Sequence, residues 1–354
     1  MAANSVTASP RIDLYSDTVT RPTPGMRKAI SEAEVGNEQA REDPTVNKLC
    51  EMVAELLGKE AAIFLPSGTM CNEIAYRVWV DHGEEIVLEE NSHALHYETG
   101  GPAALSGAMC RTIRGKRGMF TGAELEAVIR VPQGWHGQRQ RLVSIENTAN
   151  LGGGAIWPLE QIEEVAAVAR KHGLKLHLDG ARLLNAVVAS GILASAYAAP
   201  ADSAWIDLSK GLGCPVGGVL AGSKEFIEQA WRFKHQFGGA MRQAGIIAAA
   251  GVYALENHVE RMAEDHANAR LLAEGLAGIK GIGINPNEID TNMVYFTVGG
   301  TGLSEQEFAR RLRTDHGVRI GPQGKDLMRA VTHLDVSRAD IEEAIRACAA
   351  VVKG

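Results

Sequence analysis

The stretch LKLHLDGAR, residues 174–182, decides the fold class. It is a short run with alternating leucines that ends at Asp179, directly before a glycine. A run of this length, bounded by a turn residue, is typical of a strand, because helices usually need ten or more residues. The acidic Asp179 would then lie at the carboxyl end of that strand.

Further strands and helices alternate on both sides of this stretch. Apolar runs that predict strands occur at 61–65, 85–88, 142–145 and 205–209. Between them lie helical patterns, such as the one that Asp43-Pro44 opens and Gly58 closes. Strands that alternate with helices pair in parallel and carry helices on both faces of the sheet. We therefore predict an α/β fold with a large, mostly parallel sheet domain.

The pattern changes near Asn257, where a long charged helix begins. A strand at 292–297 and helices capped by Ser304 and Ser337 follow it. These features predict a smaller C-terminal α+β domain at 257–354. The large domain would span 12–256 with an N-terminal arm, after a loose tail at 1–11.

Composition limits the class of protein. The 354 residues are 45% hydrophobic with a net charge of −7, so the chain can form a substantial core but has no basic excess for nucleic acid. No apolar run approaches the ~18 residues of a membrane span. Five cysteines without a C-x-x-C pair suit a reducing compartment. We expect a cytoplasmic protein that binds neither nucleic acid nor membrane.

Two loops at predicted strand ends carry charged residues that could take part in catalysis. Asp179 and Arg182 are three residues apart, so both can face one crevice, and a buried ion pair is the equal alternative. Lys210 follows the strand at 205–209 and precedes a glycine-rich turn. An ammonium is costly to bury, so Lys210 is a candidate imine-forming amine, with a surface lysine as the alternative.

Two other loops could complete a cofactor site. Backbone N–H groups of Ser67, Gly68 and Thr69 would start a helix and could bind phosphate, although Ser67 could simply cap that helix. His93 follows another strand, where a histidine is either structural or part of a site. Pyridoxal 5'-phosphate requires four such groups together: a lysine that forms an imine, an acid that pairs with the ring nitrogen, a loop that binds phosphate and a flat side chain that stacks on the ring. The P-loop, dinucleotide, H-E-x-x-H and G-x-S-x-G motifs are absent.

Several longer motifs resemble one family, the L-threonine aldolases of the β-eliminating lyase family, which have the aspartate aminotransferase-like fold (type I) of pyridoxal phosphate enzymes. The resemblance runs from about Ile12 to the last helix. Its motifs are DLYSDTVTRPT (13–23), GKEAAIFLPSGTM (58–70), HLDGAR (177–182), LSKGLGCPVG (208–217), GGAMRQAG (238–245) and VTHLDVSR (331–338).

The resemblance implies roles for individual residues. Lys210 would carry the cofactor, Asp179 would pair with the pyridine nitrogen, and His93 would stack on the ring. Ser67, Gly68 and Thr69 would hold the phosphate. The substrate carboxylate would be held by Ser16, Arg182 and Arg329. Arg242 would reach the cofactor region of a neighbouring subunit, because the family forms homodimers or homotetramers with shared sites.

The implied reaction is retro-aldol cleavage of an L-β-hydroxy-α-amino acid to glycine and an aldehyde. Two alternatives stay open: β-elimination or racemisation on the same Lys210 and Asp179, and a non-catalytic descendant that retains the fold. The family commonly has ENTHN where this chain has ENTAN, so Ala149 replaces a histidine, and His96 also departs from the pattern. We expect Ala149 to enlarge the pocket for aryl substrates such as phenylserine. His93, His96 or water would then take the hydroxyl proton. The equal alternative is that water serves the hydroxyl and threonine remains the substrate.

Overall fold

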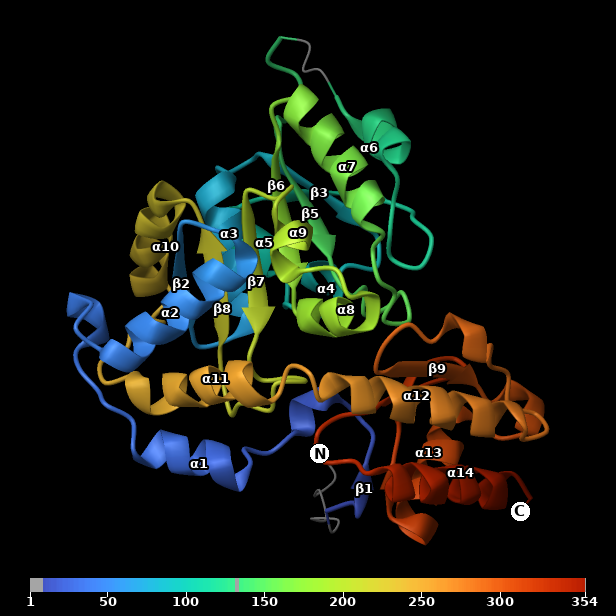
Figure 1. The fold of residues 1–354 in the computed structure, drawn as a ribbon. Helices are drawn as coiled ribbons and strands as arrows, with labels where there is room; N and C mark the ends of the chain where they lie inside the picture. The colour runs from blue at the N-terminus through green and yellow to red at the C-terminus, as the bar shows by residue number, and fades with distance from the viewer. Residues whose placement is uncertain (1–8, 131–133, 354) are drawn as a thin grey trace, which may run out of the picture. The chain divides into compact units, whose positions relative to one another are not determined.

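The computed structural model describes residues 9–130 and 134–353, so residues 1–8 of the expected tail lie outside the described part. The chain divides into two compact units (Figure 1). The larger is Thr20–Met262, and the smaller combines Met1–Val19 with Ala263–Gly354.

The larger unit is built on a seven-stranded sheet with the order β2-β8-β7-β6-β5-β3-β4. All neighbours from β7 to β4 pair in parallel, and β8 is antiparallel to both β2 and β7. The predicted α/β class with a mostly parallel sheet is thereby confirmed. The strands are β2 (Ala61–Leu65), β3 (Glu85–Glu89), β4 (Met109–Ile113), β5 (Gln140–Glu146), β6 (Lys175–Gly180), β7 (Ser203–Asp207) and β8 (Gly218–Gly222).

Helices of the larger unit begin and end where local side chains stabilise them. Asp43 accepts a hydrogen bond from the Val46 N–H at 3.0 Å, and Gly58 closes the same helix at φ 62°. The helices are α1 (Pro24–Ser31), α2 (Pro44–Leu57), α3 (Gly68–Trp79), α4 (His93–His96), α5 (Gly101–Ser106), α6 (Gly122–Val128), α7 (Leu159–Lys171), α8 (Leu183–Ser190), α9 (Ala194–Ala198), α10 (Lys224–Gln236) and α11 (Gly245–Asn257), with the 3₁₀ turn η2 (Glu38–Ala40).

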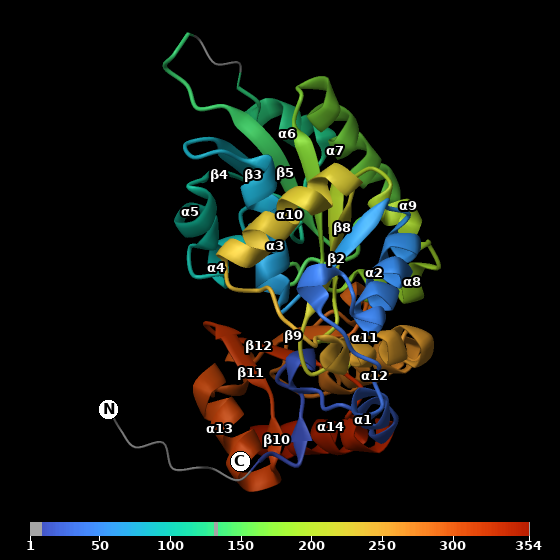
Figure 2. The same ribbon diagram turned by 90° about the vertical axis from the view of Figure 1, so that its left-hand side faces the viewer.

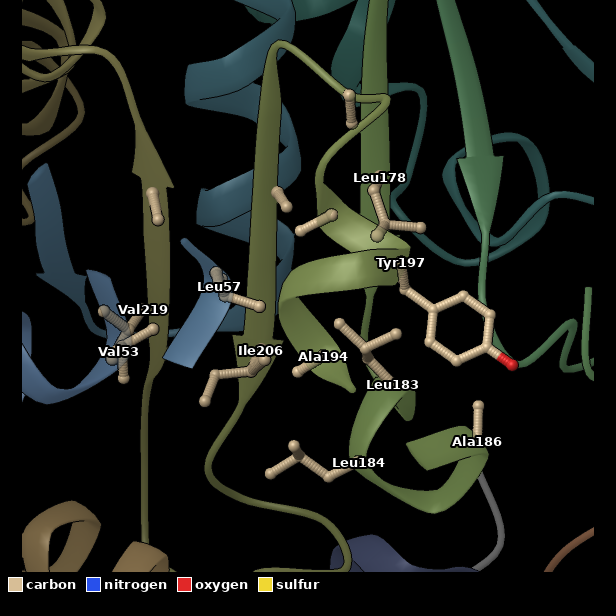
Figure 3. Close-up of a cluster of buried hydrophobic side chains, with 14 of the residues drawn as sticks. Val53, Leu57, Leu178, Leu183, Leu184, Ala186, Ala194, Tyr197, Ile206 and Val219 are labelled. Atoms are coloured by element: carbon tan, nitrogen blue, oxygen red, sulfur yellow. The ribbon is translucent and has the colours of Figure 1, made fainter. Parts of the chain in front are cut away.

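Alternate residues of the central strands pack against different helices. Leu178, Ile206 and Val219 pack with residues of α2, α8 and α9 (Figure 3). Trp205 and Leu220 belong to a separate buried cluster with residues of α3 and α10, and Figure 2 shows these two helices beside the sheet. This is the two-residue period of a strand that is buried on both faces. The carboxyl ends of the parallel strands are therefore held in fixed register. Along the described ranges, every helix is too short or too polar to span a bilayer.

The smaller unit contains the N-terminal arm. Strand β1 pairs in parallel with β10. Ile12 and Leu14 are only 2% and 0% exposed and lie in the core of this unit. The arm therefore belongs to the smaller unit, whereas the sequence predicted it as part of the large domain from residue 12. The larger unit ends at Met262, whereas the predicted end was residue 256. The elements are β1 (Ile12–Asp13), β9 (Met293–Thr297), β10 (Val318–Arg319), β11 (Gly321–Gly324), β12 (Leu327–Val331), α12 (Met262–Ala277), α13 (Glu305–His316), α14 (Arg338–Lys353) and the 3₁₀ turns η1 (Asp17–Val19), η3 (Pro286–Glu288) and η4 (Gly299–Thr301).

Candidate active site

Asp179 lies at the carboxyl end of β6 and is 4% exposed. Its Oδ2 accepts a hydrogen bond from Asn72 Nδ2 at 2.8 Å, and its Oδ1 accepts one from the Ala181 N–H at 3.0 Å. Burial, and next the charge of Glu146, raise the pKa of Asp179 to about 7, against the opposing charges of Lys210 and His93. A further cation at this carboxylate would stabilise its ionised form.

Lys210 lies in the turn after β7, with 13% of its side chain exposed. Its Nζ is 3.0 Å from Asp207 Oδ2 and 5.8 Å from the centre of the Trp205 ring. A Cβ added to Gly68 would lie 3.0 Å from the same Asp207 oxygen. The start of α3 and the Lys210 amine therefore meet at one carboxylate.

The start of α3 has the features of an anion site. Ser67 Oγ accepts a hydrogen bond from the Met70 N–H at 3.2 Å, so the serine caps the helix as the sequence allowed. The N–H groups of Gly68 and Thr69 in the first turn point away from the helix and add to its positive end. A Cβ at residue 68 would lie 2.4 Å from the Trp205 ring, so only glycine fits there.

His93 begins α4 and is held by two carboxylates. Its Nδ1 is 2.8 Å from Glu98 Oε1, and its backbone N–H donates to Glu146 Oε2 at 2.8 Å. Burial lowers the pKa of His93, but the hydrogen bond to Glu98 and the charges of Asp179, Glu98 and Glu146 outweigh burial and raise it. The imidazole thus shares its electrostatic environment with Asp179.

Asn72 on α3 joins these groups into one hydrogen-bond network. Its Nδ2 donates to Glu98 Oε1 and to Asp179 Oδ2, both at 2.8 Å. Its Oδ1 accepts from Trp205 Nε1 at 2.7 Å and lies 3.1 Å from His177 Nε2. Burial lowers the pKa of His177 to about 3, so this imidazole is neutral and donates from Nε2. All four hydrogen-bonding positions of the amide are occupied.

Sequence reasoning did not single out Asn72, Glu98 or His177. A polar residue inside a buried helix or strand could have indicated them. Asn72 lies among buried residues of α3, and His177 lies between two leucines of β6. Buried polar groups need partners, and Asn72 is the shared partner of Glu98 and His177.

The ENTAN segment follows β5 and lies in the same network. Glu146 Oε1 accepts from the Asn150 N–H at 2.7 Å, while its other oxygen holds His93. Ala149 is 3% exposed. Cβ atoms added to Gly118 and Gly152 would lie 2.6 and 3.0 Å from the Ala149 Cβ. The Ala149 methyl group therefore packs against the backbone of two glycines.

The remaining predicted residues lie in different places. Arg182 is 6% exposed, precedes the first residue of α8 and lines a small cavity together with Asp207. His96 and Arg242 are exposed, and His96 Nε2 is 2.8 Å from the Glu90 carbonyl oxygen. Neither makes a hydrogen bond to Asp179, His93 or Lys210 within residues 9–130 and 134–353.

The two predicted carboxylate-binding residues outside the larger unit are both buried. Ser16 and Arg329 belong to the smaller unit and are 5% and 8% exposed. Arg329 Nη2 donates to the Tyr15 carbonyl oxygen at 3.4 Å. The larger unit thus brings together Asp179, Lys210, His93 and the start of α3. The described residues hold no group of three acidic, histidine or cysteine side chains suited to a metal ion.

Comparisons with known proteins agree with one another. Residues 13–298 match the family model of the beta-eliminating lyases. A low specificity L-threonine aldolase from Escherichia coli (strain K12) is 42% identical over 335 residues, covering 94% of this chain and 96% of that protein.

Two solved structures have the same fold as this chain. A threonine aldolase from Leishmania major gives a TM-score of 0.82 at 21% identity, covering 96% of this chain and 99% of that one. An aspartate aminotransferase from Rhizobium meliloti gives 0.70 at 16% identity, covering 97% and 92%. These likenesses confirm the predicted aspartate aminotransferase-like architecture.

Proposed function

The chain belongs to the β-eliminating lyase family, and we propose that it is a pyridoxal 5'-phosphate-dependent aldolase that cleaves L-β-hydroxy-α-amino acids to glycine and an aldehyde. One observation carries the proposal: the larger unit gathers an amine, a buried acid and a helix N-terminus at the carboxyl ends of parallel strands. Ligands of open α/β sheets bind at this edge.

The residues fit the cofactor. Asp179 is a buried acid with a raised pKa, so a cationic ring nitrogen would stabilise its ionised form. The first turn of α3, at Ser67, Gly68 and Thr69, would hold the phosphate, and Lys210 would hold the aldehyde carbon. When bound, pyridoxal phosphate supplies a conjugated cationic ring that accepts the electron pair of the broken bond.

The chain's own residues would orient the substrate and move its protons. Arg182 would hold the substrate carboxylate, because arginine forms paired hydrogen bonds with carboxylates. For Arg329 and Ser16, the same role rests on the family resemblance alone. Cleavage of Cα–Cβ requires a base for the β-hydroxyl proton. His93 is that base in our proposal, since Glu98 holds its Nδ1 and leaves Nε2 to accept the proton.

Glycine release tests this proposal. The purified chain with added pyridoxal phosphate should release glycine and acetaldehyde from L-threonine, and Lys210→Ala should lower kcat by at least about 10³-fold. Pyruvate or the D-enantiomer as the product would instead favour a β-eliminating lyase or a racemase. If the chain binds no cofactor and remains colourless, it is a non-catalytic descendant.

The substrate range depends on the surroundings of Ala149. We propose that the enzyme accepts threonine, allo-threonine and aryl serines such as phenylserine, because alanine at residue 149 is smaller than the histidine that the family commonly has there. In an assay of kcat/KM, Ala149→His should reduce the value for L-phenylserine more than that for L-threonine. A strong preference of the unaltered enzyme for threonine would contradict the aryl-serine part of this proposal.

Assembly and compartment belong to the same proposal. A homodimer or homotetramer with shared sites would let the exposed Arg242 contact the cofactor region of a neighbouring subunit. The cytoplasm is the proposed compartment, and the five unpaired cysteines support it, because thiols stay reduced there.

A further inference from the structure

The carboxyl groups of Glu73 and Glu98 lie within hydrogen-bond reach of each other, and Glu98 also contacts His93. Glu73 on α3 and Glu98 after α4 are 1% and 5% exposed. Glu98 Oε1 accepts the Asn72 Nδ2 hydrogen bond and contacts His93 Nδ1, each at 2.8 Å. Within the described residues, neither oxygen of Glu73 nor Glu98 Oε2 has a conventional donor. Among the described residues, these three buried carboxyl oxygens therefore lie together without a hydrogen-bond donor.

Only a proton can stabilise this contact. Ionised carboxylates are acceptors without a donor, so two of them in contact repel each other unless one is protonated. Burial, and next the charge of Glu98 and the hydrogen bond to it, raise the pKa of Glu73 to about 9. Glu73 is thus the protonated member at neutral pH.

The backbone of α5 lies directly against the Glu73 carboxyl group. A Cβ added to Gly101 at the start of α5 would lie 2.0 Å from Glu73 Oε1. The α5 backbone therefore covers the carboxyl group directly, and no side chain could be accommodated between them. A buried acid that water cannot reach keeps its proton more readily than an exposed one.

We propose that Glu73 is a positioning residue that donates its carboxylic O–H to Glu98 and so directs Glu98 Oε1 at the Nδ1–H of His93. A Glu98 carboxylate with a donor on each oxygen cannot rotate without losing one of them. His93 is then fixed in the tautomer whose Nε2 lone pair faces away from Glu98. Only the use of that lone pair as a base rests on the proposed aldolase function.

Removal of the Glu73 donor should make His93 more basic. Without the hydrogen bond from Glu73, less of the negative charge on Glu98 would be neutralised. Glu98 would then stabilise the protonated form of His93 more strongly. Other titratable groups are coupled to the pair by charge: the charge of Glu73 acts on Tyr76 and Cys110, and the charges of Asp179 and Glu146 act on His93. They are unchanged in every variant below, so differences between variants report Glu73 itself.

Two substitutions separate the donor from the bulk of the side chain. Glu73→Gln retains an N–H donor for Glu98 Oε2, whereas Glu73→Leu removes it at similar size. The matched control is Glu55→Gln, since Glu55 is an exposed glutamate on α2.

Infrared spectroscopy of the cofactor-free chain detects the proton. The carboxylic acid C=O band should be present at pH 7 in the unaltered chain and in Glu55→Gln, and smaller in Glu73→Gln. In the first two proteins the Glu73 part of the band should disappear as pH rises through about 9. Asp179, with its pKa raised to about 7, contributes a band of its own that the difference spectrum removes. An identical band in Glu73→Gln would overturn the proposal.

NMR of the His93 ring detects the effect on its neighbour. The His93 titration should shift upward by at least about half a pH unit in Glu73→Leu and remain in place in Glu73→Gln. An unshifted titration in folded Glu73→Leu would also overturn the proposal, and if that variant does not fold, the infrared comparison decides. Neither measurement needs cofactor, so a failed aldolase assay would refute the proposed function and leave this inference intact.

Discussion

At the residue scale, Asn72 is the residue on which the site's geometry depends most. Asn72→Leu would leave the N–H groups of Trp205 and His177 without their acceptor and would deprive Asp179 of a donor. Buried groups without partners each cost about 1–3 kcal/mol. We expect the free energy of unfolding to fall by about 2–5 kcal/mol, measured by urea denaturation. The control Asn257→Leu loses one exposed bond to the Tyr253 carbonyl and should change it by less than about 0.5 kcal/mol; equal losses would contradict the network.

The proton on Glu73 also predicts how stability depends on pH. Because the pKa of Glu73 is raised to about 9 in the folded chain, the folded state binds more protons than the unfolded state between about pH 4.5 and 9. The contribution of Glu73 to the free energy of unfolding therefore falls as pH rises through that window. Glu73→Gln should flatten the fall in denaturation measurements without cofactor, whereas Glu55→Gln should follow the unaltered chain. Parallel curves for all three proteins would show that Glu73 is ionised in the folded state.

Local motifs could reveal only part of this site. Asp179, Lys210 and Ser67 were predicted because each follows its own strand within a few residues, where an apolar run and its polar end are visible together. The contact between Asn72 and Glu98 depends on the packing of α3 beside α4 and α5, and their contact with Asp179 depends on the order of strands in the sheet. Neither arrangement is encoded in a short stretch of sequence.

At the scale of elements, a buried ion pair joins η2, β2 and α10. Lys234 and Glu38 are 0% and 1% exposed and form a direct ion pair, and Lys234 Nζ also donates to the Phe64 carbonyl oxygen at 2.7 Å. Glu38 Oε2 accepts from the Met241 N–H at 2.8 Å. The pair therefore connects the strand that leads to Ser67 with the segment that carries Arg242.

Breaking this pair should be costly. Lys234→Met leaves the Glu38 carboxylate buried without its cation, so we expect a loss of about 3–5 kcal/mol in the free energy of unfolding. The double variant with Glu38→Gln should recover part of that loss in a double-mutant cycle. The control Glu228→Gln breaks an exposed ion pair between α10 and Arg41, the residue after η2, and should cost less than about 1 kcal/mol. Additive losses would mean that the two side chains are not coupled.

Capping residues made helices the most predictable elements. The Thr121 side chain and Glu124 form a capping box at the start of α6, and Ser304 caps α13 as predicted. Strand β8 was not predicted, because its sequence GVLAG contains two glycines and lacks an alternating pattern. Its antiparallel direction depends on the turn around Lys210, which reverses the chain between β7 and β8. Tertiary packing, and not local propensity, therefore decides this strand.

At the scale of the whole molecule, the proposed sharing of sites between subunits has a consequence for mixed assemblies. The Arg242 side chain is exposed in the single chain, while its backbone carbonyl accepts the Glu38 N–H at 2.9 Å. The backbone is thus held in place and the guanidinium is available to another subunit. If it completes a neighbour's site, each active site combines Lys210 from one chain with Arg242 from another.

Hybrid assemblies test this arrangement. Lys210→Ala and Arg242→Ala should each be nearly inactive alone, since the first lacks the amine and the second lacks the cation supplied across the interface. When the two are unfolded and refolded together as dimers, half of the assemblies are hybrids, and one of the two sites in each hybrid has both residues intact. Glycine release should then recover to about a quarter of the unaltered activity. If Arg242 acts within its own chain, no site in any mixture has both residues, and activity should stay at the level of the separate variants.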